Sequence, residues 1–179
     1  MSKEYIENIN QFRKRKNNQF QNHPQFSPLT EEQRAVFKEL NYFEVDEKYK
    51  LIVKIEEFPD PKEKITMLTT KGSDSIQRIF GKINFQIGDN RGTLQVYVSD
   101  QNPDYLFLPF MDKTSGEETY GAGRYVELEE FNLGEYILDF NMAYNPYCAY
   151  NDNWVCPVPP KENRLDFPIK AGEKSFRAY

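Results

Sequence analysis

Residues 83–98, which read INFQIGDNRGTLQVYV, decide the fold class of this chain. Apolar side chains alternate with polar ones on both sides of a short turn sequence, Gly88-Asp89-Asn90-Arg91-Gly92. A period of two is typical of a strand with one buried face, and glycine and asparagine adopt the backbone angles that tight turns need. The stretch therefore predicts a β-hairpin of two antiparallel strands.

The period of two recurs on both sides of this hairpin. It predicts further strands over residues 49–56, 64–70, 76–80, 105–110, 124–129, 135–140 and 165–169. We expect the strands at 124–129 and 135–140 to pair with each other, joined near Gly134. Helices do not alternate with these strands, which excludes a parallel sheet of βαβ units. The sequence predicts a mainly β fold, an antiparallel β-sandwich or barrel, and does not choose between the two.

The N-terminal region follows a helical pattern instead. Apolar residues recur at helical spacing between Tyr5 and Phe12. The sequence Thr30-Glu31-Glu32-Gln33 is a capping box, in which the threonine and glutamine side chains each bond the backbone of the other residue. We therefore expect two N-terminal helices within residues 1–45 and a β domain over residues 46–179, together forming a single domain.

Composition limits the function classes. The net charge is −5, and phosphate contacts need a basic surface, so nucleic acid is excluded as a general partner. The one basic run, residues 13–16, lies in the first predicted helix and is interpreted as a solvated face. Aromatic residues make up 15% of the chain, a share that disordered chains lack, so we expect a core rich in phenylalanine and tyrosine.

Membranes, metals and cofactors are not indicated either. No stretch is apolar over the length of a membrane span, and the first residues lack the apolar segment of a secretion signal, which predicts a cytoplasmic protein. Cys148 and Cys156 are then expected to be buried thiols without catalytic reactivity, because no cationic cluster stands near them. A disulfide is the alternative for an exported protein. With His23 as the only histidine, the ligands are too few for a zinc site, and we expect no cofactor.

Residues 141–163 stand apart from the strand pattern. The segment holds four prolines and five asparagines, which exclude a long helix or a central strand. It also holds the only tryptophan, Trp154, with three tyrosines and both cysteines. Loops of this length are uncommon in compact domains unless they are functional or packed on themselves. We expect an ordered loop that packs back on the sheet, with Trp154 contributing to that packing.

Two charged residues near this loop are the strongest candidates for a site. Arg124 follows the turn Tyr120-Gly121-Ala122-Gly123, where glycines allow the close approach of an anion that arginine can bind. Asp139 ends the strand predicted to pair with the one that Arg124 begins, so we expect the two to be cross-strand neighbours. Each has a structural alternative: Arg124 can pair with a structural carboxylate, and Asp139 can anchor the loop by accepting backbone N–H groups.

Polar residues of the loop complete the candidate ligand-binding set. Glu162 follows a stiff proline-rich arm, and we expect it to return near the place where the loop leaves the sheet. The full set is Tyr120, Arg124, Asp139, Asn141, Tyr144, Asn145, Tyr150, Glu162 and Asn163. Tyrosine supplies stacking area, while asparagine and arginine give direction to a polar ligand.

Several segments in the second half of the chain carry a family resemblance. They are Leu106-Phe107-Leu108-Pro109-Phe110, Thr119-Tyr120-Gly121-Ala122-Gly123-Arg124-Tyr125, Asp139-Phe140-Asn141, Ala143-Tyr144-Asn145-Pro146, Cys148-Ala149-Tyr150, Cys156-Pro157, Pro159-Pro160 and Glu162-Asn163-Arg164-Leu165. With these segments the chain resembles the family of domain of unknown function 1684, a group of uncharacterised bacterial and archaeal proteins. The resemblance implies no reaction, because the family has no assigned one.

Three functions remain open. The first is a β domain that binds a small polar ligand between the sheet and the loop over residues 141–163. The second is a cofactor-independent hydrolase or isomerase in which Asp139 and Glu162 act as paired carboxylates. The third is a purely structural or partner-binding domain. The lack of a nucleophile next to a base favours binding, since His23 lies in a connector. The sequence does not specify the oligomeric state.

Overall fold

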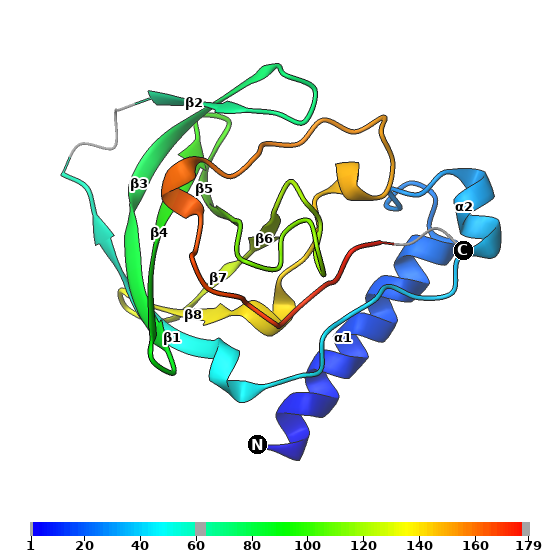
Figure 1. Ribbon diagram of the computed structural model, residues 1–179, viewed down its shortest axis with the longest axis horizontal. Helices are drawn as coiled ribbons and strands as arrows, with labels where there is room; N and C mark the ends of the chain where they lie inside the picture. Colours follow the sequence, from blue (N-terminus) through cyan, green and yellow to red (C-terminus); the bar gives the residue numbers. More distant parts are fainter. Residues whose placement is uncertain (1, 60–63, 177–179) are drawn as a thin grey trace.

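The computed structural model describes residues 2–59 and 64–176, whose strands form one curled antiparallel sheet (Figure 1). The strands within these residues are β1 (Lys50–Glu57), β2 (Lys64–Leu68), β3 (Asp74–Ile87), β4 (Asn90–Ser99), β5 (Asn102–Phe110), β6 (Arg124–Val126), β7 (Leu128–Asn132) and β8 (Glu135–Asp139). The helices of the same residues are α1 (Lys3–Asn22) and α2 (Glu31–Val36), with short 3-10 helices η1 (Glu47–Tyr49), η2 (Phe140–Met142), η3 (Tyr147–Ala149) and η4 (Lys161–Asn163). The predicted mainly antiparallel β fold with two N-terminal helices is confirmed.

The hairpin at residues 83–98 lies at the centre of the sheet, in β3 and β4. Its strands pair antiparallel, with Phe85 opposite Gly92. Gly88 adopts a φ of 59°, which other residues rarely adopt, and this allows the tight turn. The Phe85 ring covers Gly92, where an added Cβ would lie 2.5 Å from a ring carbon. The shape of the hairpin therefore requires glycine at both positions.

The sheet closes on itself through one interrupted strand. In the order β6-β5-β4-β3-β1-β8-β7, with β2 also paired to β3, the strands β6 and β7 stand at opposite ends, yet only Glu127 separates them in the chain. Val126 pairs with Leu108 of β5, and Leu128 pairs with Leu138 of β8. Because one chain segment pairs with both ends of the order, the sheet has a barrel-like curl and is not a sandwich of two sheets (Figure 1).

Three strand predictions need correction. Residues 76–80 form no strand of their own but belong to β3, which continues to Ile87. The sequence predicts one strand over residues 124–129, but this segment breaks at Glu127 because its two halves pair with different partners. Residues 165–169 form no strand, and they contain Pro168, which lacks an N–H donor for a ladder. The predicted alternation still holds in their burial, since the side chains that point inward are Leu165, Phe167 and Ile169.

Aliphatic and aromatic side chains fill the interior of the curled sheet. The ring of Phe140 lies at its centre, 5.5 Å from the ring of Phe85 and 5.2 Å from that of Phe110. The C-terminal segment crosses the mouth of the barrel in Figure 1, and its alternate side chains Leu165, Phe167, Ile169 and Ala171 join the same buried cluster. Burial of this apolar surface is the main source of stability, at roughly 25 cal/mol per Å².

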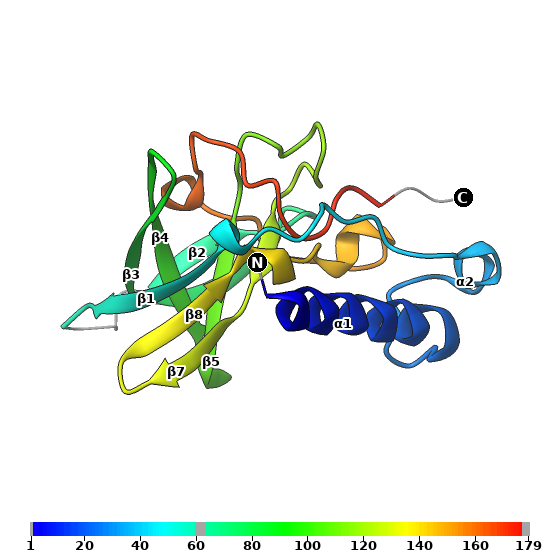
Figure 2. The same cartoon turned by 90° about the horizontal axis from the view of Figure 1, so that it is seen from below.

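Helix α1 lies outside the sheet, along the segment that follows β8 (Figures 1 and 2). Arg13 of this helix donates to the Phe43 carbonyl at 3.0 Å, and Lys16 pairs with Glu173 at 2.5 Å. The basic run at residues 13–16 is therefore only partly a solvated face, because Arg13 and Lys16, one turn apart, face the protein. None of the described helices is apolar over the length that crossing a bilayer requires.

The loop over residues 141–163 packs along one side of the sheet. It bonds to strand β2, where Val158 donates to the Leu68 carbonyl at 2.8 Å. Trp154 contributes less than predicted, since its indole is 42% exposed and lies against the ring of Tyr147, 5.0 Å away. The sheet anchors this loop mainly through backbone hydrogen bonds, whereas the Trp154 indole donates to the Pro28 carbonyl at 3.3 Å.

Candidate functional site

The structure separates the residues that the sequence groups into one site. Arg124 lies opposite Phe110 of β5, whereas Asp139 lies opposite Lys50 of β1. The prediction that Arg124 and Asp139 are cross-strand neighbours is wrong, because the strand that Arg124 begins is interrupted at Glu127 and only its second half pairs with β8. Each candidate residue has its own place in the fold.

Arg124 is a buried structural residue. Its side chain is 1% exposed and donates to the Asp112 carboxylate at 2.8 Å and to the Ile169 carbonyl at 2.9 Å. It also donates to the carbonyls of Ala171 and Glu173. Burial lowers the pKa of the Arg124 guanidinium, and the negative charge of Asp112 opposes this shift. Arg124 therefore holds the C-terminal segment across the barrel mouth, which is the structural alternative for this residue.

Asn163 is also a structural residue. It is fully buried in η4, and its amide donates to the Gln95 carbonyl at 2.8 Å and to the Pro109 carbonyl at 2.7 Å. Its side-chain oxygen accepts from the Gln95 N–H at 2.8 Å. These three bonds use both N–H donors and one lone pair of the side-chain oxygen, and they clamp the end of the loop to β4 and β5.

The carboxylate pair of the enzyme hypothesis does not form. Glu162 is exposed on η4, which packs against β4. A carboxylate oxygen of Glu162 lies 3.8 Å from the ammonium nitrogen of Lys161. Asp139 ends β8 beside α1, where it accepts from the Tyr5 hydroxyl at 2.7 Å and from the Asn141 N–H at 3.0 Å. The two carboxylates belong to different parts of the molecule, so the geometry does not support acid/base chemistry between them.

Asn141 completes a polar anchor at the start of α1. Its amide donates to the Asp46 carbonyl at 2.9 Å and to the Tyr5 hydroxyl at 3.0 Å, and its oxygen accepts from the Asp46 N–H at 3.0 Å. Burial, followed by the hydrogen bond to Asp139, raises the pKa of Tyr5, so its hydroxyl stays a neutral donor. The anchor fixes one end of α1 against the end of β8.

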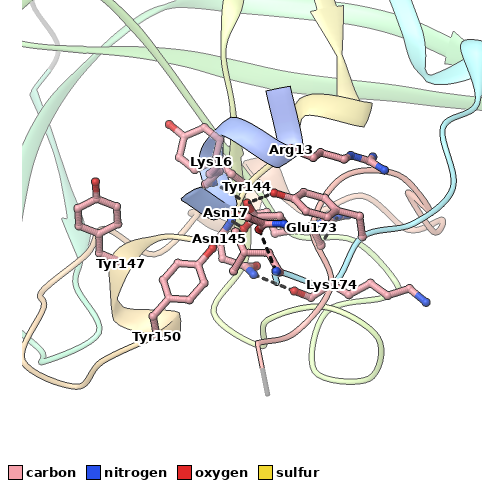
Figure 3. Close-up of polar contacts among 12 residues, drawn as sticks. Arg13, Lys16, Asn17, Tyr144, Asn145, Tyr147, Tyr150, Glu173 and Lys174 are labelled. Atoms are coloured by element: carbon pink, nitrogen blue, oxygen red, sulfur yellow. Dashed lines mark hydrogen bonds and ion pairs between the residues drawn. The ribbon is translucent and has the colours of Figure 1, made fainter. Parts of the chain in front are cut away.

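A second polar cluster surrounds Glu173, a residue that the sequence does not single out (Figure 3). Its carboxylate is 1% exposed and accepts from the Lys16 ammonium at 2.5 Å, from the Asn145 N–H at 2.9 Å and from the Tyr150 hydroxyl. The Asn145 amide also donates to the Lys174 carbonyl at 2.8 Å. The cluster joins α1, the loop and the C-terminal segment. No periodic pattern marks Glu173, which lies 28 residues from Asn145 in the chain.

A cavity of about 830 Å³ lies between α1 and the outward-facing residues of β8, and we call it the α1–β8 cavity. The helix lines it with Tyr5, Asn8, Ile9, Phe12, Arg15, Lys16, Gln19 and Phe20, and the opposite wall consists of Lys50, Glu127, Glu129, Ile137, Asp139, Met142, Tyr144 and Tyr147. The helical residues recur at intervals of three and four, so they form one face of α1. Of the candidates from the sequence, this cavity contains Asp139 and Tyr144. The sequence does not indicate the helix wall, because the candidate residues all lie in the second half of the chain.

Tyr144 and Glu127 form a polar edge of the α1–β8 cavity. The hydroxyls of Tyr144 and Tyr105 both donate to the Glu127 carboxylate, at 2.5 and 2.8 Å. The Lys16 ammonium lies 5.1 Å from the centre of the Tyr144 ring, within the range of a cation–π contact. Burial raises the pKa of Tyr144 and raises that of Tyr105 to about 12, so both hydroxyls remain neutral donors at physiological pH.

Tyr120 belongs to a third cluster, around the two cysteines. Its hydroxyl donates to the sulfur of Cys148 at 3.7 Å. Cys148 and Cys156 are both free and buried, which confirms the prediction of buried thiols. Within residues 2–59 and 64–176, no three histidine, cysteine or carboxylate side chains are arranged to hold a metal ion.

Comparisons with known proteins identify a family and a fold. The sequence matches the family described as "Protein of unknown function (DUF1684)" over residues 35–174. The chain is similar to an uncharacterized protein of Haloarcula marismortui, solved by solution NMR, with 32% sequence identity and a TM-score of 0.69. This match covers 96% of the present chain and 94% of the other. No curated protein matches the sequence.

Proposed function

Because the chain belongs to the family of proteins of unknown function DUF1684, whose description states no activity, we propose a function from the geometry of its own residues. We propose that the protein binds a small polar ligand with an apolar body in the α1–β8 cavity. The observation that carries this proposal is a cavity whose lining combines aromatic and aliphatic side chains with charged and amide groups.

The size and walls of the cavity support a small organic ligand. Pockets for such ligands commonly enclose about 300–1,000 Å³, and the cavity volume of about 830 Å³ falls in this range. Ile9 and Phe12 of α1 face Ile137 and Met142 on the other wall, and Tyr144 adds an aromatic face. These side chains offer contact area to an apolar ligand body.

The charges that line the cavity favour a ligand without a large net charge. Three cations line it, Arg15, Lys16 and Lys50, and three carboxylates oppose them. The carboxylates are Glu127, Glu129 and Asp139. Because the two signs balance, the lining suits an uncharged polar or zwitterionic molecule better than a multivalent ion. Glu127 and Asp139 already accept tyrosine hydroxyls and are held in place by them.

A metabolite screen by thermal shift tests the proposal with a variant that fills the cavity. Ile137→Trp places a larger side chain on the cavity wall, and Leu133→Trp makes a comparable change at a position that is 98% exposed and outside the lining. A ligand at 100 times its dissociation constant stabilises the wild type by about 2.7 kcal/mol. We expect this stabilisation in the wild type and in Leu133→Trp, and its loss in Ile137→Trp.

Two results would contradict the proposal. One is a screen in which no polar small molecule shifts the unfolding temperature. The other is a ligand that stabilises Ile137→Trp as strongly as the wild type, since that ligand would bind elsewhere. Circular dichroism of each variant checks that the fold is retained.

The proposal also includes the domain organisation and the cellular location of the protein. We propose that residues 1–179 form a single domain, supported by the contact of Lys16 near the start of the chain with Glu173 near its end. We propose a cytoplasmic location, supported by two cysteines that are free thiols, the form that a reducing compartment maintains. No specific observation favours an enzyme.

A further inference from the structure

Two cysteines that do not belong to the α1–β8 cavity lining lie in contact with each other. Cys148 lies in η3, and Cys156 lies where the loop returns to the sheet. The Cys148 N–H donates to the sulfur of Cys156 at 3.4 Å. The Cys156 side chain also acts on the Cys148 thiol, since it is the largest cause of the lowered pKa of Cys148. A chain of only seven residues between them has therefore folded back so that the thiols meet.

The surroundings distinguish the two thiols. Cys148 accepts the Tyr120 hydroxyl at 3.7 Å, in addition to its contact with Cys156. Cys156 is held by its backbone, whose N–H donates to the Thr70 hydroxyl at 3.3 Å and whose carbonyl accepts from the Thr70 N–H at 3.0 Å. The hydrogen bond from Cys156, with a smaller one from Tyr120, lowers the pKa of Cys148 to about 6, whereas the same contact and burial raise the pKa of Cys156.

We propose that Cys148 and Cys156 are a reversible oxidation site, in which a hydroperoxide oxidises Cys148 and Cys156 then closes an intramolecular disulfide. No cationic cluster stands near the two cysteines in the sequence, but thiolates also gain stability from hydrogen-bond donors, and the fold places the Tyr120 hydroxyl beside the Cys148 sulfur. Cys148 is 7% exposed and Cys156 8%, and this burial favours a small oxidant over a large one.

The two steps balance in atoms and electrons. In the first, the Cys148 thiolate attacks an oxygen of hydrogen peroxide; an S–O bond forms, the O–O bond breaks, and hydroxide takes a proton to leave as water. In the second, the Cys156 sulfur attacks the sulfenic sulfur; an S–S bond forms, the S–O bond breaks, and a second water leaves with the thiol proton. Two thiols are oxidised, one peroxide is reduced, and a dithiol reductant reverses the change.

Disulfide formation alters the part of the loop that carries the exposed aromatic residues. The bond closes a ring over residues 148–156, which contains Trp154, and it starts next to Tyr147, whose side chain lines the α1–β8 cavity. The indole of Trp154 contacts the Tyr147 ring. Because this is the only tryptophan of the chain, its fluorescence reports on the loop directly.

The test uses the full chain, reduced and then exposed to equimolar hydrogen peroxide. We expect intact mass to fall by two hydrogen atoms, peptide mapping to show Cys148 linked to Cys156, and tryptophan fluorescence to change and then recover with dithiothreitol. In Cys156→Ser the reaction should stop at a sulfenic acid on Cys148 that dimedone traps, and Cys148→Ser should react much more slowly. Alkylation of the wild type at neutral pH should label Cys148 before Cys156.

Other results would overturn the proposal. They are thiols that resist peroxide until the protein is unfolded, disulfides that form only between molecules, or a sulfenic acid that appears on Cys156 as fast in Cys148→Ser as on Cys148 in Cys156→Ser. The order of alkylation and the mapping of the oxidised wild type need no variant, so they decide the matter even if a serine variant does not fold. Neither measurement involves a ligand, so the outcome is independent of the proposed function.

Discussion

Polar side chains line both the barrel mouth, where Arg124 holds the C-terminal segment, and the α1–β8 cavity. The two regions differ in whether these side chains face open volume. At the mouth, Arg124 gives its guanidinium to Asp112 and to backbone carbonyls, and its side chain is 1% exposed. In the cavity, Tyr144 and Asp139 bond to neighbours but also face open volume. The Arg124 side chain is enclosed by its own contacts, whereas Tyr144 and Asp139 lie beside open volume, where we propose that a ligand binds.

The difference shows which polar residues of this fold have a structural role and which can bind a ligand. In the sequence, an arginine or asparagine near a polar loop suggests a binding site. In the structure, Arg124 and Asn163 donate their hydrogen bonds to backbone carbonyls of segments that are distant in the chain. Such residues fix the path of the chain where regular ladders are missing. A binding residue is one whose remaining donors or acceptors face a cavity.

The largest expected effect is at the barrel mouth, from Arg124→Met. The change leaves the Asp112 carboxylate, which is fully buried, without its cation, and removing one partner of a buried pair costs about 3–5 kcal/mol of unfolding free energy. It also frees the carbonyls that the guanidinium holds. Urea denaturation followed by circular dichroism measures the loss.

Arg15→Met is the matched control for this prediction. It makes the same chemical change on the exposed side of α1, in the lining of the α1–β8 cavity, and we expect no comparable loss of stability. If Arg124→Met and Arg15→Met lowered the free energy of unfolding equally, the contrast between the barrel mouth and the α1–β8 cavity would be wrong.

A smaller loss is expected from Asn163→Ala at the end of the loop. The side chain makes three hydrogen bonds to β4 and β5, and leaving their backbone partners buried and unpaired costs about 1–3 kcal/mol. The neighbouring Glu162 is exposed, so Glu162→Ala should leave the urea midpoint almost unchanged. If Glu162→Ala proved the more damaging, the assignment of Asn163 as the clamp would be wrong.

The fold was largely predictable because its signals are local. The hairpin at residues 83–98 and the capping box at Thr30 depend on neighbours in sequence, and both form as expected. The break at Glu127 was not predictable, because the alternation of apolar and polar residues continues on both sides of it. The break arises because closure of the sheet pairs β6 with β5 but β7 with β8. Local patterns do not state which strand a given strand pairs with.

The candidate site was less predictable for the same reason. The sequence identified Asp139 and Tyr144, which do line the α1–β8 cavity, but the other wall comes from α1, more than a hundred residues away in the chain. Glu173 was missed because its role depends on Lys16 and Tyr150 reaching it from two other segments. Contacts of this kind follow from the tertiary fold and leave no periodic mark in the sequence.

Among the substitutions that are not controls, the smallest loss of stability is expected from Tyr144→Phe, which is also the sharpest test of the cavity. The hydroxyl donates to Glu127, which is exposed and also accepts from Tyr105, so its removal leaves no buried group unpaired and costs less than about 0.5 kcal/mol. Affinity for a ligand found by the thermal-shift screen should nevertheless fall about tenfold, the equivalent of one hydrogen bond of about 1.4 kcal/mol. Tyr136→Phe, the same change outside the cavity lining, should leave that affinity unchanged. Titration calorimetry of both variants compares the two, and an affinity that is insensitive to Tyr144→Phe would mean that this edge of the cavity does not touch the ligand.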